Sequence, residues 1–224
     1  MEGYDAQYKL SILGSIGFHT RVNVDDVYRE GITKINSEDI AFGREMGYVL
    51  KLLAIGKDNG DTIEARVHPA FLPADHPLAR VEGSLNAVYL FGHSFKDMML
   101  EGRGAGDAPT ASAIVGDIIQ AAQNAVHPMP YMQEKPKPVA DDWQSRYFIR
   151  MKAKDEPGVL AEVTGKMAQA GISVSAMLQK DAAPDGKATL IFITHIASEK
   201  AVQGAVKSLN PEICTVENVL RVEG

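Results

Sequence analysis

Prolines concentrate in one stretch of this 224-residue chain and limit how the residues on either side of it can fold. Residues 125–146 contain Pro128, Pro130, Pro136 and Pro138 together with several charged side chains. A segment of this composition is extended and semi-rigid, and it connects folded units. We therefore expect two structural units, residues 1–124 and residues 147–224, joined by a linker over residues 125–146.

The hydrophobic pattern after this linker alternates between the periods of strands and helices. Alternating residues predict a strand over 147–154, and Leu160, Val163 and Met167 predict the inner face of a helix over 159–170, which Gly171 ends. The remaining expected elements are a strand over 172–179, a turn at Pro184-Asp185-Gly186, a strand over 188–195, a helix over 198–208 and a strand over 213–222. The order βαββαβ is typical of a ferredoxin-like unit.

The first half of the chain predicts an antiparallel or mixed sheet with helices. Asp5 can cap a helix that runs to about Phe18, with Leu10, Leu13 and Ile16 toward a core. A second helix is expected over 37–47. Strands are expected over 48–55, from residue 63 onward, over 86–91 and over 97–101. A hairpin turn is expected at Asp58-Asn59-Gly60-Asp61, and chain breaks at Pro69, Pro73 and Pro77. The fold class is therefore α+β.

Three glycines within five residues precede the next expected helix, over 109–122. Gly102, Gly104 and Gly106 allow close approach to the main chain, and Asp107 can cap the helix. The helix N-terminus favours an anion or a polar ligand, although a tight turn into a packed helix explains the same residues. The spacing also differs from the G-x-G-x-x-G fingerprint of dinucleotide-binding folds.

Asp5 and Lys9 are four residues apart and share one face of the first helix. A solvated ion pair worth a few tenths of a kcal/mol is one interpretation of this spacing. The functional alternative is an acid–base lysine that a carboxylate orients.

Composition and motifs exclude several classes of function. The net charge of -6 and the absence of a Lys/Arg cluster argue against nucleic acid and acidic membranes as partners. Cys214 is the single cysteine, no 18-residue apolar run occurs and no signal peptide opens the chain, so we expect a cytoplasmic protein. Histidine spacing predicts no metal site, and no nucleophile elbow or P-loop is present.

A series of motifs in the first half, in order along the chain, resembles the substrate-binding and dimerisation region of homoserine dehydrogenases. The motifs are Glu2–Leu10, Glu30-Gly31-Ile32, Gly47–Ala54, His68-Pro69-Ala70, His76–Ala79, Asn86-Ala87-Val88 and Gly102–Asp117. The resemblance implies NAD(P)-dependent interconversion of aspartate semialdehyde and homoserine, in threonine and methionine biosynthesis. By position, Lys9 matches the catalytic acid–base lysine, and Asp5 matches the carboxylate that binds the substrate amino group.

The same resemblance implies a cofactor-facing segment at Gly102, Gly104, Ala105, Gly106 and Thr110. The family's Rossmann domain, with its glycine-rich finger and a second lysine, has no counterpart in these residues. We therefore expect the C-terminal part of such an enzyme, inactive alone and without bound NAD(P). In the family, the 109–122 helix packs on the nucleotide-binding domain. Because that domain is not among these residues, we expect this helix to expose its apolar face.

The βαββαβ half resembles an ACT domain, a small regulatory module that binds amino acids. Its turn residues Asp155, Pro157, Gly158, Val159 and Leu160 are the expected effector site. Backbone NH groups near Gly158 can hold a carboxylate and Asp155 an ammonium, although Gly158 can also serve only the turn. The resemblance implies threonine as effector and a homodimer. A stand-alone amino-acid sensor and a dimerisation scaffold are the alternative functions.

Overall fold

A computed structural model describes residues 1–123, 136–180, 183–184 and 186–224. The helices are α1 (Tyr4–Gly17), α2 (Ser37–Glu45), α3 (Asp107–Ala122), α4 (Val159–Gln169) and α5 (Glu199–Lys207), with short 3-10 turns at Val24–Asp26 and Pro77–Arg80. The strands are β1 (Tyr28–Arg29), β2 (Tyr48–Asp58), β3 (Ile63–Pro73), β4 (Leu85–Gly92), β5 (Lys96–Arg103), β6 (Gln144–Lys154), β7 (Val174–Lys180), β8 (Lys187–Thr194), β9 (Ala197–Ser198) and β10 (Cys214–Val222).

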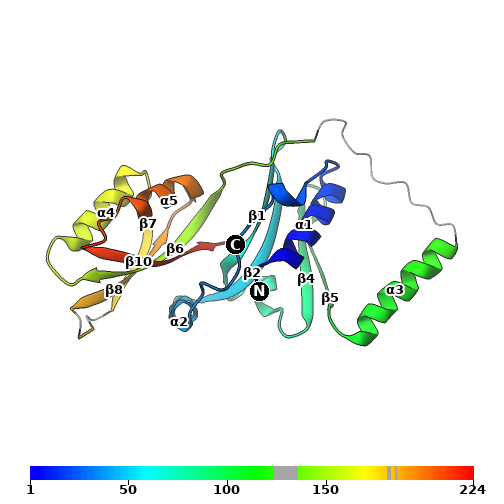
Figure 1. The fold of residues 1–224 in the computed structure, drawn as a ribbon, viewed down its shortest axis with the longest axis horizontal. Coiled ribbons are helices and arrows are strands. Elements are labelled where there is room, and N and C mark those ends of the chain that lie inside the picture. Colours follow the sequence, from blue (N-terminus) through cyan, green and yellow to red (C-terminus); the bar gives the residue numbers. More distant parts are fainter. Residues whose placement is uncertain (124–135, 181–182, 185) are drawn as a thin grey trace.

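One mixed sheet runs through both halves of the chain (Figure 1). Its order is β1-β3-β10-β6-β8-β7, with β2 paired to β3 and β9 to β6. Strand β2 occupies one edge of β3 in antiparallel register, from Tyr48 opposite Pro73 to Asp58 opposite Ile63. On the other edge, β1 and β10 both run parallel to β3. The sheet is mixed as expected, and it connects the two sequence units directly.

The prolines of the first half correct one prediction. Pro69 and Pro73 do not break the chain, because both lie within β3 and face Leu52 and Tyr48 of β2. Pro69 lies between the residues of β3 that pair with β1 and those that pair with β10. A residue without an NH group is tolerated at such a change of partner.

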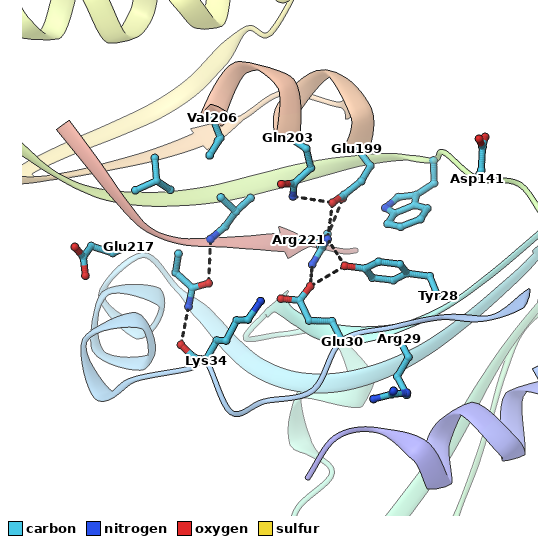
Figure 2. Close-up of a pocket in the computed structure, with 14 residues that line it drawn as sticks. Tyr28, Arg29, Glu30, Lys34, Asp141, Glu199, Gln203, Val206, Glu217 and Arg221 are labelled. Atoms are coloured by element: carbon cyan, nitrogen blue, oxygen red, sulfur yellow. Dashed lines mark hydrogen bonds and ion pairs between the residues drawn. The ribbon is translucent and has the colours of Figure 1, made fainter. Parts of the chain in front are cut away.

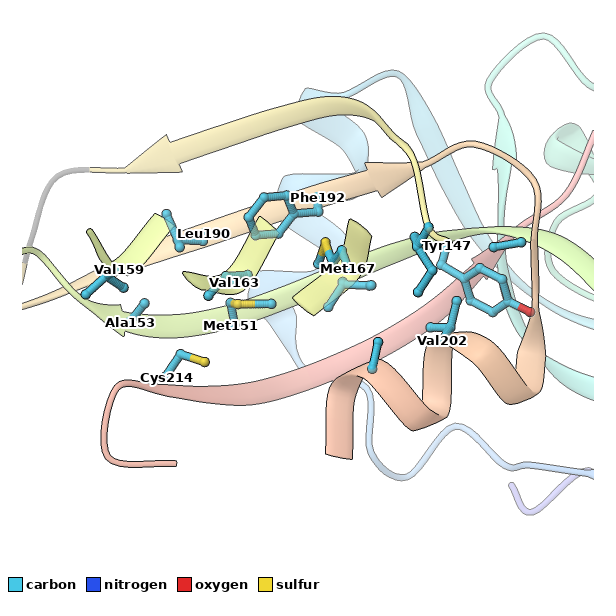
Figure 3. Close-up of a cluster of buried hydrophobic side chains, with 14 residues drawn as sticks. Tyr147, Met151, Ala153, Val159, Val163, Met167, Leu190, Phe192, Val202 and Cys214 are labelled. Carbon is cyan, nitrogen blue, oxygen red and sulfur yellow. The ribbon is translucent and has the colours of Figure 1, made fainter. Parts of the chain in front are cut away.

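Strands β10, β6, β8 and β7, with α4 and α5, form the predicted βαββαβ unit. Its helices cover one face of the sheet, where Met151, Val163, Met167 and Phe192 pack together (Figure 3). Gly171 follows α4 with a φ of 72°, the left-handed conformation predicted for it. Asp185 of the predicted turn and residues 124–135 of the predicted linker lie outside the described residues.

The opposite face of this unit is covered by the first half of the chain. Phe71 of β3, Phe148 of β6 and Leu220 of β10 belong to one buried cluster, against which Phe42 of α2 packs. Helix α2 approaches so closely that a Cβ at Gly43 would lie 2.1 Å from the Phe71 ring. Strands β6 and β8 of the βαββαβ sheet are therefore buried on both faces within one chain, whereas the edge strand β7 is partly exposed.

Helix α1 packs on β2 and β3 through Gln7, Leu10 and Gly14. The predictions for Leu13 and Ile16 are wrong, since both side chains are exposed. Asp5 is also not the N-cap, because the helix begins at Tyr4 after Gly3, whose φ is 81°. A left-handed glycine reverses the chain there without a side-chain cap.

Strands β4 and β5 form a separate ribbon that leads into α3; we call these three elements the arm. Figure 1 shows α3 at the outer end of the arm, away from the mixed sheet. No residue of α3 is buried, and Ile114, Val115, Ile118 and Ile119 are all more than half exposed. The predicted exposure of this apolar face is confirmed. Gly106, and not Asp107, occupies the N-cap position, with no side-chain hydrogen bond.

Candidate functional site

Asp5 and Lys9 form an ion pair on the outer face of α1, with 2.8 Å between Lys9 Nζ and Asp5 Oδ2. Both side chains are exposed, and the neighbouring Tyr4, Tyr8 and Ile12 are exposed as well. The shared helix face predicted from the spacing is confirmed. A charged pair surrounded by apolar side chains can hold a polar substrate once another surface covers it.

The predicted cofactor-facing residues form an open loop between β5 and α3. Gly102 and Arg103 end β5, and Gly104 donates its backbone NH to the Ser84 carbonyl at 3.2 Å. Thr110 donates its backbone NH to Gly106, whose φ of 124° is one that side chains disfavour. Ala105 and Thr110 are exposed.

This loop offers free NH groups at the start of α3, but it does not by itself form a dinucleotide site. Residues 102–110 do not line the cavity formed by Tyr28, Trp143 and Arg221, nor the neighbouring one formed by Asp25, Val27 and Pro138. No hydrogen bond or ion pair among the described residues joins this loop to Asp5 or Lys9. The residues present therefore border an open surface and do not by themselves enclose a dinucleotide cofactor.

The predicted effector residues lie at the turn between β6 and α4. Gly158 has a φ of 96° and precedes α4 without a side-chain cap, which leaves NH groups of the first helical turn available. Asp155 accepts a hydrogen bond from Gln179 at 3.2 Å through its side chain. Val159 is buried and Leu160 is half-buried, so these two residues contribute to the core as well.

Sequence reasoning missed a cluster of charged residues at the junction of the two halves. Arg221 of β10 is buried and donates from Nε to Glu199 Oε2 at 3.0 Å. It also pairs with Glu30 and donates to the Tyr28 hydroxyl at 3.2 Å, while Tyr28 donates to Glu30 at 3.0 Å. We call Tyr28, Glu30, Glu199 and Arg221 the junction cluster.

The junction cluster lines an open cavity of about 580 Å³, which Figure 2 shows. Burial alone would lower the pKa of Arg221, but the hydrogen bonds and charge of Glu199 outweigh it and raise that pKa. Burial raises the pKa of the Tyr28 hydroxyl despite the opposing charge of Arg221. Arg221 therefore stays charged and Tyr28 neutral over the range of ordinary pH.

A second buried arginine joins the βαββαβ unit to α2. Arg150 of β6 donates to Asp39 at 2.7 Å and to Glu38 at 2.8 Å. Asp39 also accepts from the Asn218 amide at 2.8 Å and forms a capping box with Asn36. These contacts tie the start of α2 to β6 and β10.

A third buried group centres on Arg66 and His68 of β3. Arg66 pairs with Glu223 at 3.1 Å, and its guanidinium lies 5.2 Å from the centre of the Trp143 ring. His68 stacks on Trp143, and burial, with the charges of Arg221 and Arg66 nearby, lowers the pKa of its imidazole to about 3. His68 is therefore neutral in the folded protein near neutral pH.

One sequence signal could have revealed this junction. Arg66, Arg150 and Arg221 each stand between two apolar residues in a strand, where a charge is buried only if it is paired. Apart from Glu64, which lies two residues before Arg66, the carboxylate partners come from other segments, so spacing alone does not identify them. Among the described residues, no set of three His, Cys, Asp or Glu side chains is arranged to hold a metal ion. No helix in the described ranges is long and apolar enough to cross a membrane.

Comparison with known proteins gives two family matches. A family model described as homoserine dehydrogenase matches residues 1–119, and an ACT domain model matches residues 147–213. Homoserine dehydrogenases of Corynebacterium glutamicum and Mycobacterium tuberculosis are 41% and 38% identical over the whole chain and are covered to 52% and 54% of their own length. The chain thus spans about half the length of these relatives.

A solved structure of a homoserine dehydrogenase has a similar fold. The crystal structure of a homoserine dehydrogenase from Thiobacillus denitrificans superposes with a TM-score of 0.86 at 33% identity. The match covers 100% of this chain and 53% of that one.

Proposed function

This chain belongs to the homoserine dehydrogenase family, and we propose that it is the C-terminal part of such an enzyme. It supplies the substrate-binding region (residues 1–124), a linker (125–146) and an amino-acid-binding regulatory domain (147–224). The reaction is the NAD(P)-dependent interconversion of aspartate semialdehyde and homoserine in the cytoplasm. The observation that carries this proposal is the Asp5–Lys9 pair on the outer face of α1.

The two charged side chains of this pair divide the chemistry between them. The Lys9 ammonium gives a proton to the oxygen of the substrate carbonyl and takes it back in the reverse direction. Asp5 binds the substrate ammonium, as carboxylates do in charge-assisted hydrogen bonds. Since Lys9 is exposed, a second surface is needed to remove water from it before proton exchange near neutral pH is efficient.

We assign that second surface to a nucleotide-binding domain that packs against the exposed face of α3. NAD(P) supplies or accepts the hydride there, and Gly102, Gly104, Ala105, Gly106 and Thr110 border it from this side. The open loop between β5 and α3 supports the proposal that this chain alone neither binds NAD(P) nor turns over substrate.

An assay of the purified chain, with and without its missing part, tests this proposal. The chain alone is expected to oxidise neither NADH nor NADPH in the presence of aspartate semialdehyde. The portion of the Corynebacterium glutamicum relative that this chain does not span is then added, and activity is expected. Lys9→Ala should lower that activity by about 10²-fold or more, the usual contribution of a general acid–base group. Equal activity of Lys9→Ala and the unchanged chain would contradict the assignment.

We also propose that threonine binds at the turn Asp155, Pro157, Gly158, Val159 and Leu160, at an interface between two copies of the βαββαβ unit in a homodimer. The uncapped start of α4 supports a carboxylate site, and Asp155 supports an ammonium site. A thermal melt with millimolar threonine, run beside light scattering, tests this directly. A raised midpoint supports the site, since a ligand that binds only the folded state stabilises it by mass action. Isothermal titration without heat for threonine, isoleucine and methionine would contradict it.

The alternative function is a dimerisation scaffold, which the exposed apolar residues of α3 favour. In that case the chain forms a stable dimer, threonine shifts no melt and the reconstitution assay yields no activity. The two experiments above therefore distinguish the alternatives.

A further inference from the structure

A three-residue segment, Tyr28–Glu30, lies between the junction cluster and the start of α1. Strand β1 pairs with β3 through Tyr28 opposite Arg66 and Arg29 opposite Val67, and Glu30 donates its backbone NH to Val67 at 2.8 Å. Successive side chains of a strand point to opposite faces. Tyr28 and Glu30 therefore share one face, and Arg29 points to the other, as Figure 2 shows.

The first face of this segment contacts the βαββαβ unit. Tyr28 and Glu30 both bind Arg221 of β10, and Arg221 binds Glu199, the first residue of α5. Arg221 is almost completely buried, so its guanidinium has little freedom to exchange these partners for water. A displacement of α5 would therefore move Glu199, the acceptor that holds Arg221, and with it the guanidinium that donates to Tyr28 and Glu30.

The second face contacts the residues that precede Asp5. Arg29 donates from Nη1 to the Glu2 carbonyl at 2.6 Å, and its guanidinium lies 3.7 Å from the centre of the Tyr4 ring. A Cβ at Gly3 would lie 3.4 Å from Arg29 Cγ, so the left-handed residue that starts α1 packs directly against this arginine.

The residues that follow the segment complete this contact. A Cβ at Gly31 would lie 2.8 Å from the Glu2 Cα, and Ile32 donates its backbone NH to the Met1 carbonyl at 3.2 Å. Arg29 of the segment that binds Arg221 thus holds residues 2–4, and the two residues after the segment hold Met1 and Glu2. Because Asp5 follows at once on α1, the orientation of this first turn sets the direction of the Asp5–Lys9 pair.

We propose that Arg29 is a positioning residue for Asp5 and Lys9, and that Tyr28–Glu30 transmits the position of α5 in the regulatory domain to them. This inference rests on the proposed function for the roles of Asp5 and Lys9. The connection itself consists of contacts within this chain and can be tested without turnover.

Hydrogen–deuterium exchange of the full chain, followed by mass spectrometry, tests the connection. Glu30→Gln removes the charge that faces Arg221 and leaves the backbone intact. It is expected to raise exchange in residues 3–9 roughly threefold or more, because local opening of α1 becomes easier. Arg29→Met should do the same, and Arg29→Lys, which keeps a donor for the Glu2 carbonyl, should recover at least half of the protection.

The contact between α2 and Arg150 supplies a matched control. Glu38→Gln removes one charge from Arg150, as Glu30→Gln does from Arg221, but Glu38 has no bond to the Tyr28–Glu30 segment. It should raise exchange in α2 and leave residues 3–9 unchanged. The proposal is overturned if Glu30→Gln leaves residues 3–9 unchanged, or if both variants raise exchange across the whole chain alike.

These results separate the inference from the proposed function. If reconstitution yields no activity but exchange follows the expected pattern, the connection stands and the roles of Asp5 and Lys9 fall. If Lys9→Ala abolishes reconstituted activity and Glu30→Gln has no local effect, the proposed function stands and the connection falls.

Discussion

The βαββαβ sheet and the arm use the same kinds of apolar side chains in opposite ways. Strands β6 and β8 of the βαββαβ sheet are covered on both faces, by α4 and α5 on one side and by α2 and Phe71 on the other. The arm leaves Phe91, Leu100 and Ile118 exposed, and no residue of α3 is buried. Exposed apolar side chains, where they gather into a patch, are typical of a surface that a partner covers.

The difference shows where the stability of this chain resides. Burial of apolar side chains stabilises the βαββαβ unit within one chain, whereas the arm gains nothing comparable until a partner packs on it. Substitutions should therefore affect the two regions unequally.

Core truncation should give the largest difference between the two regions. Phe192→Ala should lower the free energy of unfolding by about 4 kcal/mol, because it opens a cavity beneath α4. Ile118→Ala on α3 should change it by less than about 0.5 kcal/mol. Urea titration of both variants measures this, and equal losses would show that α3 is packed in solution.

The buried ion pairs should give the next largest effect. Asp39→Asn should cost about 3 kcal/mol, because Arg150 then keeps only the half-exposed Glu38 as an anionic partner. Lys200→Gln removes an exposed pair with Asp141 and should cost less than about 0.5 kcal/mol. If Asp39→Asn is as mild as this control in denaturant titrations, the junction does not depend on charge pairing.

Acid should destabilise the mixed sheet around His68 of β3 before it affects the arm. His68 is neutral in the folded state down to pH values near its lowered pKa of about 3, whereas it protonates near pH 6.5 when unfolded. The stabilisation is thus complete above pH 6.5 and falls as the pH drops toward 3, by about 2 kcal/mol at pH 5. Denaturant titrations at pH 7.5 and 5 measure it, and His68→Asn should flatten the dependence. An equal slope in that variant would assign the effect to another group.

The smallest effect on stability is expected at the candidate site itself. Lys9→Ala removes an exposed ion pair and should change the free energy of unfolding by less than about 0.5 kcal/mol. A thermal melt of the variant, read beside its activity in the reconstituted enzyme, separates a catalytic role from a structural one. A large drop in the melting midpoint would mean that Lys9 stabilises α1.

The sequence predicts local structure well wherever one segment determines it. The hairpin at Asn59-Gly60, the left-handed Gly171 and the shared face of Asp5 and Lys9 all depend on neighbouring residues. The order of elements in the βαββαβ unit likewise follows from the spacing of hydrophobic residues within each segment.

Predictions fail where distant segments decide the outcome. Leu13 and Ile16 have the period of a core face, yet nothing in the described chain covers them. Pro69 was expected to end a strand, but the pairing of β3 changes partner at that residue. The carboxylates that bind Arg150, and Tyr28, which binds Arg221, lie more than a hundred residues earlier in the chain, so no local pattern identifies them. The linker boundaries remain a prediction.

The pairing of β10 with β3 has a consequence for folding during synthesis on the ribosome. Ala70 and Phe71 pair with Arg221 and Val222, which are synthesised well after them. This part of the β3 edge therefore stays unpaired, and one side of Phe71 stays uncovered, until β10 has been synthesised. Unpaired edges and uncovered apolar surface recruit neighbouring chains. We expect the nascent first half to depend on chaperones, and its sheet to be completed only after β10 has left the ribosome.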